Sequence, residues 1–455
     1  MLKAVILAAG KGTRMRSENS KVLFNVAGKP MIDYVIESSR NCGVDEIIVI
    51  VGNCAEKVME HTKASDIKFA MQKEQKGTAD AVKQALEYIN DDDKILILCG
   101  DMPLIKSETL KEFIEKSEKN INFISTKTDN PTGYGRIVRS PNGDVIKIIE
   151  EKDANENEKN INEINTGVYF CVGKDLKERL LNVDSNNAQN EFYLTDIVKG
   201  GAFAYCCNND TEFLGINDRL QLEVASKIMW KNRAKEFMKN GVSILDSDTF
   251  YCDDKVSISK DTIIYPNVFI EGNVTIGENC KIYSGCRIKN SIIENNCEIR
   301  DNSLIDTSFI GANSNVGPMA HLRPETKLLG NNRIGNFVET KKTVLGLDSK
   351  ASHLTYLGDS QIGNNVNIGC GTITCNYDGY NKYNTIIEDD VFVGSDVQLV
   401  APVKIGKNVI IAAGTTVTKD VPENALAISR TLQSNKENLG LEIKERNKSI
   451  KEKNA

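Results

Sequence analysis

The hydrophobic pattern divides the chain into two parts with different periods. Up to about residue 230, short aliphatic runs alternate with stretches of helical spacing. Runs such as Ala4–Ala9, Glu46–Val51 and Lys94–Cys99 are typical of parallel strands that a sheet buries on both faces, and Met31–Asn41 and Thr78–Tyr88 have the spacing of helices. This alternation predicts a doubly wound α/β domain, whose ligands bind beyond the carboxyl ends of the strands.

One helix is predicted to connect the two parts. Asp218 is a suitable N-cap with Gln221 three residues later, and Gly241 is a suitable stop, so we expect a helix over 218–240. The expected domains are a first domain over 1–217, a linker over 218–250, a repeat domain over 251–430 and a C-terminal tail over 431–455.

Beyond Tyr251, aliphatic residues recur at every sixth position in several runs, the first three of which are separated by slips of one residue. The positions are Ile258, Ile264, Ile270, Ile276, Ile282 and Ile288, then Ile293, Ile299 and Ile305, then Ile310, Val316, Leu322, Leu328 and Ile334, and finally Ile387, Val393, Leu399, Ile405, Ile411 and Val417. Neither the helical period of 3.6 nor the strand period of 2 explains this spacing. It predicts a β-solenoid in which three hexads close one coil, with roughly nine coils over residues 255–420.

The repeat is interrupted by the polar and aromatic segment Thr372–Thr385. A regular coil cannot hold it, so we expect it to project. A tolerated surface loop is one interpretation. A binding site or subunit contact is the other, because loops on rigid scaffolds often carry function.

Composition narrows the class of protein. With 57 Lys and Arg against 63 Asp and Glu, the net charge of −6 argues against nucleic acid as the main partner. No run approaches the 18 or more apolar residues that a transmembrane helix needs. The 12 cysteines are scattered without a C-x-x-C pair, which favours buried thiols in a reducing compartment over disulfides or zinc. We therefore expect a soluble, cytoplasmic protein that binds neither nucleic acid nor membrane.

A glycine-rich turn follows the first predicted strand. In AAGKGTRM, Ala8–Met15, Gly10 and Gly12 allow a ligand to approach the backbone, and the amides with Lys11 and Arg14 favour phosphate. The segment is not a P-loop and lacks the full G-x-G-x-x-G spacing, so a purely structural turn remains the alternative at this point.

Three further features strengthen the nucleotide interpretation. Lys21 follows in the same loop, and Gln72 with Gly77-Thr78 stands between a strand and a helix, where a base can be hydrogen-bonded. Asp101 ends a buried strand, where a divalent metal on phosphates would lie. Each has an ordinary structural explanation, such as a capping Asp or a solvated Gln, but their order in the chain favours a nucleotide site.

Motifs along most of the chain resemble one bacterial family. The shared motifs of the first part are LAAGKGTRM, SKVL, QKGTADA, GDMPL, PTGYGRI, EEKDA, INTGVYF, NNAQNEFYLTDI and GINDRLQL. The family is that of the bifunctional enzymes that make UDP-N-acetylglucosamine, in which an N-acetylglucosamine-1-phosphate uridyltransferase is fused to a glucosamine-1-phosphate N-acetyltransferase. The resemblance runs from residue 2 to about 430. It implies a Rossmann-like nucleotidyltransferase domain followed by a left-handed parallel β-helix of hexapeptide repeats.

The resemblance implies specific roles for residues of the first part. UTP and the UDP-sugar would be bound by Leu7, Ala8, Ala9, Gly10, Arg14, Lys21, Gln72, Gly77, Thr78, Gly135, Glu150, Asn165 and Asn217, of which Gly135, Glu150 and Asn165 would hold the sugar. Asp101 and Asn217 would ligate Mg²⁺. The sugar phosphate is itself the nucleophile for the α-phosphorus of UTP, so positioning and charge neutralisation would supply most of the catalysis.

Two departures from the family pattern fall in this part. Cys99 stands where the family often has Tyr, and the segment before Asn217, residues 197–216, is several residues shorter than usual. The shorter segment determines where Asn217 is placed, so the uridylyl-transfer activity depends on the position that Asn217 takes in this chain.

The repeat part carries polar motifs that a plain spacer would not need. They are HLRPETKL, GNFVETKK, SHLTYLGD and NVNIGCGTITCNYDGYNKYNT. The resemblance implies that Arg323, Lys341 and Lys382 hold the phosphate of glucosamine-1-phosphate, that Tyr356, Asn367 and Asn376 bind its sugar, and that His353 is the general base for the 2-amine. It assigns to the acetyl-CoA site Cys370, whose amide would support the oxyanion, together with Asn376, Tyr377, Lys382, Ser395, Ala413 and Arg430.

Alternatives remain for this second part. His353 could be a structural histidine, and Cys370 or Cys375 could form an acetyl-cysteine, although neither has an evident partner base and direct transfer is favoured. The flat faces of a solenoid suit a homotrimer with sites at subunit boundaries. The protein could instead be a nucleotidyltransferase for another sugar whose solenoid only oligomerises, or a non-catalytic trimeric scaffold. The HLTYLGD and CNYDGYNK motifs argue against the first of these, and the Asp101–Asn217 pair argues against the second.

Overall fold

A mixed sheet forms the centre of the N-terminal part, in the order β11-β7-β10-β6-β1-β4-β5. The strands on this path are β1 (Leu2–Leu7), β4 (Glu46–Val51), β5 (Ile67–Met71), β6 (Lys94–Cys99), β7 (Ile121–Lys127), β10 (Glu163–Val172) and β11 (Phe203–Cys207). Two further strands, β8 (Arg136–Arg139) and β9 (Val145–Ile149), join the sheet through the pairing of β8 with β10. The central strands β6, β1, β4 and β5 are parallel, whereas β10 runs antiparallel between β6 and β7. The predicted strands over 46–51 and 94–99 are confirmed.

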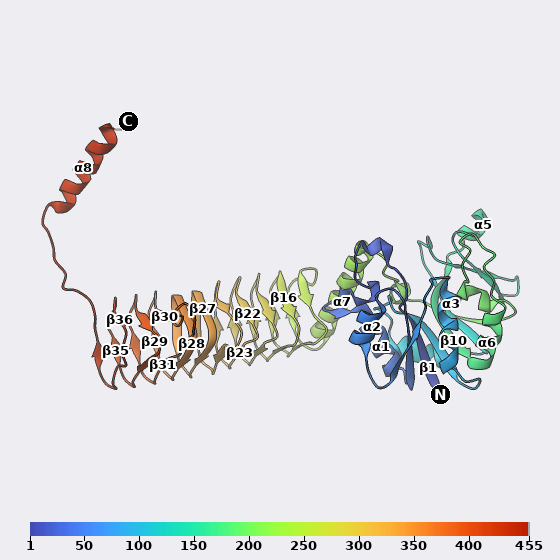
Figure 1. Ribbon diagram of the computed structural model, residues 1–455, viewed down its shortest axis with the longest axis horizontal. Coiled ribbons are helices and arrows are strands. Elements are labelled where there is room, and N and C mark those ends of the chain that lie inside the picture. The colour runs from blue at the N-terminus through green and yellow to red at the C-terminus, as the bar shows by residue number, and fades with distance from the viewer. Residues whose placement is uncertain (454–455) are drawn as a thin grey trace. The chain divides into compact units, whose positions relative to one another are not determined.

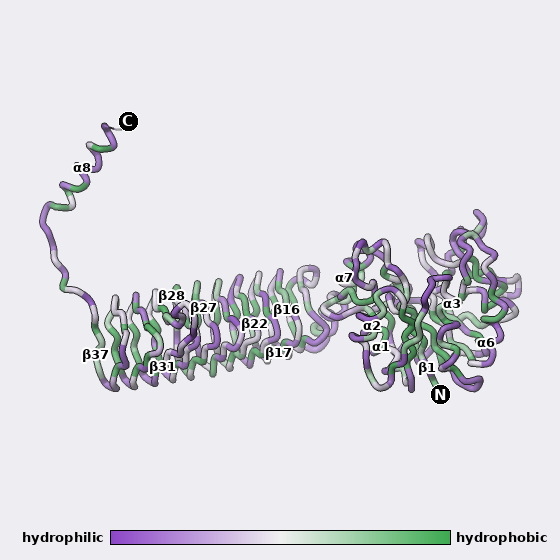
Figure 2. Tube along the Cα trace, in the orientation of Figure 1, coloured by the Kyte–Doolittle hydropathy of each residue, from purple (hydrophilic) through white to green (hydrophobic). Residues whose placement is uncertain are grey.

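Two hydrophobic cores cover the two faces of this sheet. Val5 and Ile48 belong to one core with residues of α3 and α6, and Ala4 and Ile47 belong to the other with residues of α1, α2 and α4. Both faces of the strands are therefore buried, which explains their continuous aliphatic runs (Figure 2). The helices are α1 (Met31–Asn41), α2 (Ala55–Thr62), α3 (Thr78–Lys83), α4 (Ser107–Glu115), α5 (Glu156–Lys159), α6 (Gly173–Leu181) and α7 (Arg219–Lys239).

Short elements complete this part of the fold. They are the 3-10 turns η1 (Thr13–Met15), η2 (Lys21–Leu23), η3 (Leu86–Tyr88), η4 (Leu194–Val198) and η5 (Asp210–Phe213), and the hairpins formed by β2 (Asn25–Val26) with β3 (Lys29–Pro30) and by β8 (Arg136–Arg139) with β9 (Val145–Ile149). The helix predicted over 78–88 is α3 followed by η3. The linker helix predicted over 218–240 corresponds to α7, where the Gln221 amide donates to Asp218 Oδ1 at 2.9 Å.

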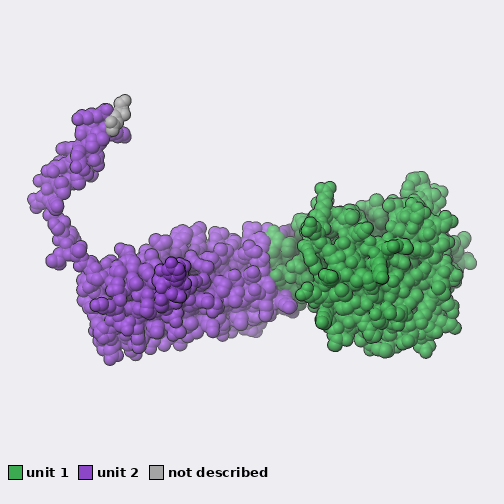
Figure 3. Space-filling model, in the orientation of Figure 1, with its two compact units in different colours: residues 1–236, 250–254 green, residues 237–249, 255–455 purple. Residues whose placement is uncertain are grey.

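The computed structural model describes residues 1–453, which divide into two compact units (Figure 3). The first unit consists of residues 1–236 and 250–254, and the second of residues 237–249 with 255 onward. The short segment Phe250–Asp254, which contains β13 (Phe250–Cys252), thus belongs with the first unit although it follows α7.

The second unit is a parallel β-helix of stacked short strands (Figure 1), in which most strands pair with the strand three places later. Face A carries β14 (Val256–Ile258), β17 (Val274–Ile276), β20 (Ile292–Ile293), β23 (Phe309–Ile310), β26 (Lys327–Leu328), β31 (Thr385–Ile387) and β34 (Val403–Ile405). Face B carries β12 (Ser243–Ile244), β15 (Ile263–Ile264), β18 (Lys281–Ile282), β21 (Glu298–Ile299), β24 (Asn315–Val316), β29 (Asn367–Ile368), β32 (Phe392–Val393), β35 (Ile410–Ile411) and β37 (Leu426–Ala427).

Face C completes each coil. It carries β16 (Val268–Glu271), β19 (Arg287–Lys289), β22 (Leu304–Asp306), β25 (His321–Leu322), β30 (Ile373–Cys375), β33 (Gln398–Val400) and β36 (Thr416–Val417). The strands β27 (Arg333–Leu345) and β28 (Lys350–Ile362) each run through all three faces without a break. The six-spaced aliphatic residues stack in buried columns, as Ile264, Ile282 and Ile299 do, so the predicted solenoid is confirmed.

The interrupting segment folds into a small hairpin. Tyr377 and Lys382 form an antiparallel bridge, and the Tyr383 amide donates to the Asn376 carbonyl at 2.9 Å. Tyr380 at its tip is 92% exposed, so the segment projects as expected.

The C-terminal tail ends in α8 (Leu439–Lys453), whose side chains are all outside the core. Over residues 1–453, no helix combines the length and the apolar character needed to cross a bilayer.

Candidate functional site

A cavity of about 260 Å³ opens beside the carboxyl ends of β1 and β6. It is lined by Leu7, Ala8, Ala9, Gly10, Lys21, Val22, Gln72, Gln75, Gly77, Thr78, Ala81, Cys99, Asp101 and Glu191. The structure thus brings together most of the residues predicted to bind the nucleotide. Sequence reasoning missed the polar residues Gln75 and Glu191, although they lie within the quoted motifs QKGTADA and NNAQNEFYLTDI. Arg14 is exposed and does not line the cavity.

The glycine-rich loop has the backbone features of an anion site. A Cβ on Gly10 would meet no atom within 4 Å, so the loop is open to a ligand there. Gly12 has φ +59°, and a Cβ on it would lie 2.8 Å from the Cβ of Lys21, so this glycine lets the loop pass close to Lys21. Within the described chain, no hydrogen-bond acceptor faces the amides of Gly10–Gly12. Unpaired amides beside a lysine favour phosphate.

The opposite wall is held by side-chain and backbone contacts. Gln72 is 4% exposed, and its Nε2 donates to the Gly77 carbonyl at 3.1 Å and to Asp80 Oδ2 at 2.9 Å. Gly77 has φ +117°, and a Cβ there would lie 2.5 Å from the Phe192 carbonyl oxygen. The Leu194 amide donates to Thr78 Oγ1 at 2.9 Å. The segment after Glu191 therefore closes one side of the cavity.

The two predicted metal ligands converge on one cation. Lys21 Nζ forms an ion pair with Asp101 Oδ2 and lies 3.1 Å from Asn217 Oδ1. Asn217 is seated by its amide, which donates to Gln221 Oε1 at 2.7 Å, while the Ile216 amide donates to the Asp101 carbonyl at 3.0 Å. The short segment over 197–216 thus still ends with Asn217 beside Asp101. A carboxylate and an amide oxygen suit a hard divalent cation that takes its other ligands from phosphate and water.

The predicted sugar residues also lie together. The Asn165 amide donates to the Gly135 carbonyl at 2.8 Å, and a Cβ on Gly135 would lie 3.5 Å from the Glu150 carboxylate. Burial raises the pKa of Glu150, whose Oε1 accepts from Thr195 Oγ1 at 3.2 Å. Sequence reasoning missed Thr195, although it lies in the quoted motif NNAQNEFYLTDI.

Cys99 lies where the nucleotide cavity approaches the sugar residues. A Cβ on Gly167, two residues after Asn165, would lie 3.3 Å from Cys99 Sγ. Burial and the Asp101 charge raise the pKa of Cys99 to about 12, so its thiol is neutral. This position therefore supplies no charge to a substrate.

In the solenoid, register places the predicted base and acetyl-CoA residues in one column. Asn336 pairs with His353, and the same offset that pairs Lys350 with Asn367 sets His353 against Cys370. The column continues through Ser395 and Ala413, because the Asp396 amide donates to the Cys370 carbonyl at 2.7 Å and the Gly414 amide to the Ser395 carbonyl at 2.9 Å. Arg430 reaches the end of this column, where its Nη1 donates to the Ala413 carbonyl at 3.1 Å. The column runs along the corner between faces B and C.

A second column on face C gathers positive charge. Register places Arg323 next to Lys341 on successive coils, and Lys341 next to Gly358. The Lys382 ammonium, then burial, then the Arg323 guanidinium lower the pKa of Lys341. Arg323 is also paired with Glu339 at 2.7 Å, so the cations of this column are partly compensated within the chain. The remaining positive charge is suited to an anion.

Tyr356 and Asn376 meet over a glycine beside these cations. A Cβ on Gly358 would lie 2.4 Å from the Tyr356 hydroxyl and 2.8 Å from Asn376 Nδ2. Asn376 is 7% exposed and donates to Asp359 Oδ2. These groups are suited to the hydroxyls of a sugar.

Within one chain, Asn367 and Tyr377 do not lie with Tyr356 and Asn376. Asn367 pairs with Lys350 and Phe392 on face B, whereas Tyr356 is on face C. Tyr377 is 60% exposed in the projecting hairpin, and its hydroxyl donates to the Gly379 carbonyl.

Asn336 is a further contact that sequence reasoning missed. Its Oδ1 lies 3.1 Å from His353 Nδ1. When Nδ1–H donates to this oxygen, Nε2 is left as the proton acceptor. The available signal was the motif GNFVETKK, one coil before SHLTYLGD, but the motif was used only for Lys341.

Comparisons with known proteins agree with this division. Residues 3–211 match the family described as nucleotidyl transferase, residues 252–345 match the GMPPB C-terminal domain, and residues 384–419 match the bacterial transferase hexapeptide (six repeats). The chain therefore combines a nucleotidyltransferase with a hexapeptide-repeat acyltransferase.

Several relatives match it over nearly the whole of both chains. It is 47% identical to the bifunctional protein GlmU of Clostridioides difficile over 446 residues, covering 96% of both chains. It is 47% identical to that of Pelobacter propionicus, covering 97% of this chain and 99% of the relative, and 48% identical to that of Geotalea uraniireducens with the same coverage. The chain belongs to the GlmU family of bifunctional enzymes and carries a uridyltransferase and an acetyltransferase activity.

Proposed function

We propose that the first cavity transfers a uridylyl group from UTP to N-acetylglucosamine-1-phosphate, with release of pyrophosphate. The observation that carries this proposal is the convergence of Lys21, Asp101 and Asn217 beside the open Gly10–Gly12 loop. The loop amides and Lys21 hold the triphosphate, and Gln72 with Thr78 holds the base. Arg14 borders the loop and is available to the outer phosphates.

Glu150, Asn165 and Gly135 hold the acetylated sugar and aim its phosphate at the α-phosphorus. The phosphate oxygen forms the new bond to phosphorus, and the bond to the pyrophosphate oxygen breaks. No protein base is needed, because the attacking oxygen is already anionic. Alignment and charge neutralisation therefore supply the catalysis.

Asp101 Oδ2 and Asn217 Oδ1 are the groups that would hold Mg²⁺. Among residues 1–453 there is no group of three or more His, Cys, Asp or Glu side chains arranged for a metal, so any ion here must complete its shell with phosphate oxygens and water. This donor set fits Mg²⁺, which keeps several waters and is bound through one or two carboxylates together with substrate phosphates. When bound, the ion neutralises charge on the triphosphate.

We infer that the solenoid acetylates glucosamine-1-phosphate before the uridylyl step. Arg323, Lys341 and Lys382 bind the phosphate, Tyr356 and Asn376 bind the sugar, and His353 Nε2 takes the proton from the 2-amine as the nitrogen attacks the acetyl carbonyl. The bond between the acetyl carbon and the sulfur breaks, and His353 passes the proton on to the sulfur, so coenzyme A leaves as the thiol. The Cys370 amide, which has no acceptor within the described chain, supports the developing oxyanion.

The acetyl-CoA site would lie along the corner column, between subunits of a homotrimer. Ser395, Ala413 and Arg430 follow His353 along this corner, and Asn367 and Tyr377 would reach the site from a neighbouring chain. The neutral Cys99 and the exposed Cys370 require no covalent role in this scheme.

Two single variants test the assignment of the two activities. Asp101→Ala should abolish uridylyl transfer and leave acetyl transfer near the wild-type rate. His353→Ala should reduce acetyl transfer by about 10² to 10⁴, the range for a positioned general base, and leave uridylyl transfer unchanged. Each reaction is assayed separately on the same preparation, with UTP and N-acetylglucosamine-1-phosphate or with acetyl-CoA and glucosamine-1-phosphate. If either variant impairs both reactions equally, the assignment is wrong.

A further inference from the structure

A small hydrophobic cluster connects the chain segments that carry the proposed metal site. Its buried members are Val26, Met31, Leu104, Ile216 and Ala225, and it is separate from the two cores of the sheet. Val26 follows Lys21 by five residues, Leu104 follows Asp101 by three, and Ile216 precedes Asn217. The relative positions of Lys21, Asp101 and Asn217 therefore depend on how this cluster is packed.

The hairpin of β2 and β3 is the part of this cluster that follows Lys21. Its turn is Ala27-Gly28, with φ 45° and 82°, values that a tight two-residue hairpin turn requires at both positions. The Phe24 amide donates to the Lys21 carbonyl at 3.2 Å, and the Met31 amide, just after β3, donates to the Phe24 carbonyl at 3.0 Å. The Tyr34 hydroxyl donates to the Val26 carbonyl at 2.8 Å. The hairpin and the Lys21 turn are thus parts of one hydrogen-bonded segment.

The segment Phe250–Asp254, which is distant in the sequence, contacts this hairpin. Asp254 Oδ2 lies 2.8 Å from Lys29 Nζ, and the Asp254 amide donates to the Ala27 carbonyl at 3.3 Å. Gly28 leaves room for the neighbouring aspartate, because a Cβ there would lie 2.2 Å from Asp253 Cγ.

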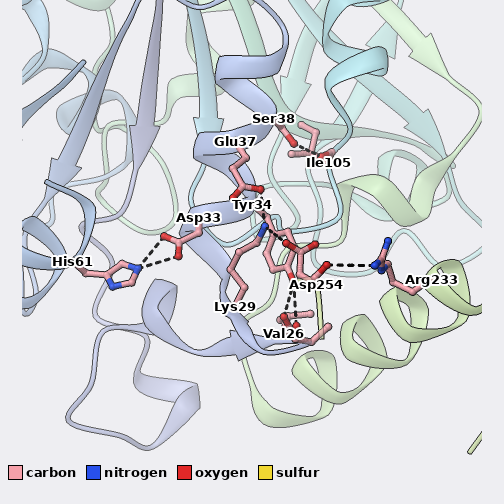
Figure 4. A network of polar contacts seen from close by, with 11 residues as sticks. Val26, Lys29, Asp33, Tyr34, Glu37, Ser38, His61, Ile105, Arg233 and Asp254 are labelled. Atoms are coloured by element: carbon pink, nitrogen blue, oxygen red, sulfur yellow. Dashed lines mark hydrogen bonds and ion pairs between the residues drawn. The ribbon is translucent and has the colours of Figure 1, made fainter. Parts of the chain in front are cut away.

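The same aspartate also binds α7. Arg233 Nη2 donates to the Asp254 carbonyl at 3.3 Å, and Figure 4 shows Asp254 between Lys29 and Arg233. Asp254 therefore contacts both α7, which begins just after Asn217, and the β2–β3 hairpin, which follows Lys21.

The side chain of Lys29 is buried, so its positive charge depends on nearby carboxylates for compensation. It is 9% exposed, its ammonium lies 4.1 Å from the centre of the Tyr34 ring, and its other carboxylate partner is Glu37 at 2.6 Å. Removing one of the two carboxylates leaves this buried ammonium with a single anionic partner, and the element that carried the lost partner is no longer tied to the hairpin by that charge. Glu37 is on α1, eight residues after Lys29, whereas Asp254 is 225 positions away in the chain.

We propose that Asp254, acting through Lys29, is a positioning residue for uridylyl transfer, which holds the hairpin and hence Lys21 in register with Asp101 and Asn217. The inference rests on the proposed roles of those three residues. Asp254 touches neither substrate nor metal in this scheme. Its effect is on how well the phosphate-binding lysine and the two oxygen ligands are aligned before substrate binds.

The test compares two variants that each remove one partner of the same ammonium. Asp254→Asn keeps the side-chain shape and the backbone contacts but removes the charge, and Glu37→Gln does the same on the other side of Lys29. We expect Asp254→Asn to lower kcat/KM for uridylyl transfer by about 10- to 100-fold, the usual range for a partner that orients ligands, and to raise the Mg²⁺ concentration needed for half-maximal rate. Glu37→Gln should stay within about twofold of wild type, since it leaves the Asp254 contact intact.

A second readout needs neither substrate nor metal. Hydrogen exchange of the amides over residues 21–30, measured on the full chain alone, should be faster in Asp254→Asn and unchanged in Glu37→Gln. Acetyl transfer should be unchanged in both. The double variant Lys29→Met with Asp254→Asn should be no worse than Lys29→Met alone, because both act through one pair.

Two outcomes would overturn the proposal. One is an Asp254→Asn enzyme that matches Glu37→Gln in uridylyl rate, Mg²⁺ requirement and amide exchange. The other is a loss of both activities together, which would mark Asp254 as a general stability residue. A wild-type enzyme without uridylyl transfer would contradict the proposed function instead, and the amide exchange would still decide the role of Asp254.

Discussion

Lys341 is a residue whose neighbours set its response to pH. The Lys382 ammonium, followed by the Arg323 guanidinium, lowers the pKa of Lys341 below the ordinary lysine value. The free enzyme therefore loses this proton at a lower pH than an isolated lysine does. A phosphate dianion binds the protonated form better, so affinity for glucosamine-1-phosphate should fall as pH rises through the lowered pKa.

The arginine variant checks this reasoning. Arginine keeps its charge at any pH at which the enzyme is stable, so Lys341→Arg should flatten the rise in KM for glucosamine-1-phosphate at alkaline pH. The KM for acetyl-CoA, measured on the same samples, is the control and should follow the wild-type curve. Parallel curves for the sugar phosphate in both enzymes would show that Lys341 does not bind the phosphate.

Asn336 should act on the reaction only through His353. Loss of one hydrogen bond is worth about 1 kcal/mol, so Asn336→Ala should lower kcat for acetyl transfer by roughly tenfold or less, with KM values nearly unchanged. Asn315→Ala is a matched control, since Asn315 makes a similar coil-to-coil contact to Glu298 on face B. If the two variants have equal kcat values, Asn336 does not orient the histidine.

At the scale of elements, Gly77 packs against the segment that connects the nucleotide cavity with the predicted sugar residues. Gly77→Ala places a Cβ against the backbone of Phe192, at a φ that alanine rarely adopts, and must displace the segment that also carries Thr195. We expect higher KM values for both UTP and N-acetylglucosamine-1-phosphate, and a cost to stability of about 1–3 kcal/mol.

Gly43→Ala separates the effect of strain from that of displacement. Gly43 also has a positive φ, 96°, but a Cβ there meets no atom within 4 Å. This control should lose stability and keep both KM values. An equal rise in KM in the two variants would contradict the connection through Phe192.

Elements that form through contacts between residues close in the sequence can be predicted from it, and elements that depend on distant pairing cannot. The hexad period predicts the solenoid because each aliphatic column is a local repeat, and the α/β strands follow from aliphatic runs buried on both faces. The continuous strands β27 and β28 were not predicted, since nothing in their composition marks the loss of the corner breaks. The antiparallel course of β10 depends on pairing with β6 and β7, which precede it by whole intervening elements.

The site residues show the same limit. Motifs located the residues around the first cavity, because each sits at a strand end or turn that the sequence marks. The contact of Asn336 with His353 was missed because the coil offset varies along the solenoid, and the contact of Lys29 with Asp254 joins residues 225 positions apart. Hydrophobic periodicity does not indicate which polar side chains from distant parts of the chain contact each other.

For the whole molecule, the placement of Asn367 bears on how the acetyl-transfer site is completed. Within one chain, Asn367 is on face B and Tyr356 is on face C, and adjacent faces of a three-sided coil point in different directions. One chain therefore does not direct both side chains at the same sugar. In a cyclic trimer, face B of one chain can approach the corner of the next, and each site would combine His353 of one subunit with Asn367 of another.

Mixed trimers test this arrangement directly. Homotrimers of His353→Ala and of Asn367→Ala should each have little acetyl transfer. A trimer that contains both variants, isolated through two different affinity tags after co-expression, should regain about one third of the wild-type activity, because one of its three boundaries carries both intact residues. Uridylyl transfer should be at the wild-type level in every sample, which confirms equal amounts of folded chain. If each site were built within a single chain, no boundary in the mixed trimer would be complete and acetyl transfer would remain as low as in the two homotrimers.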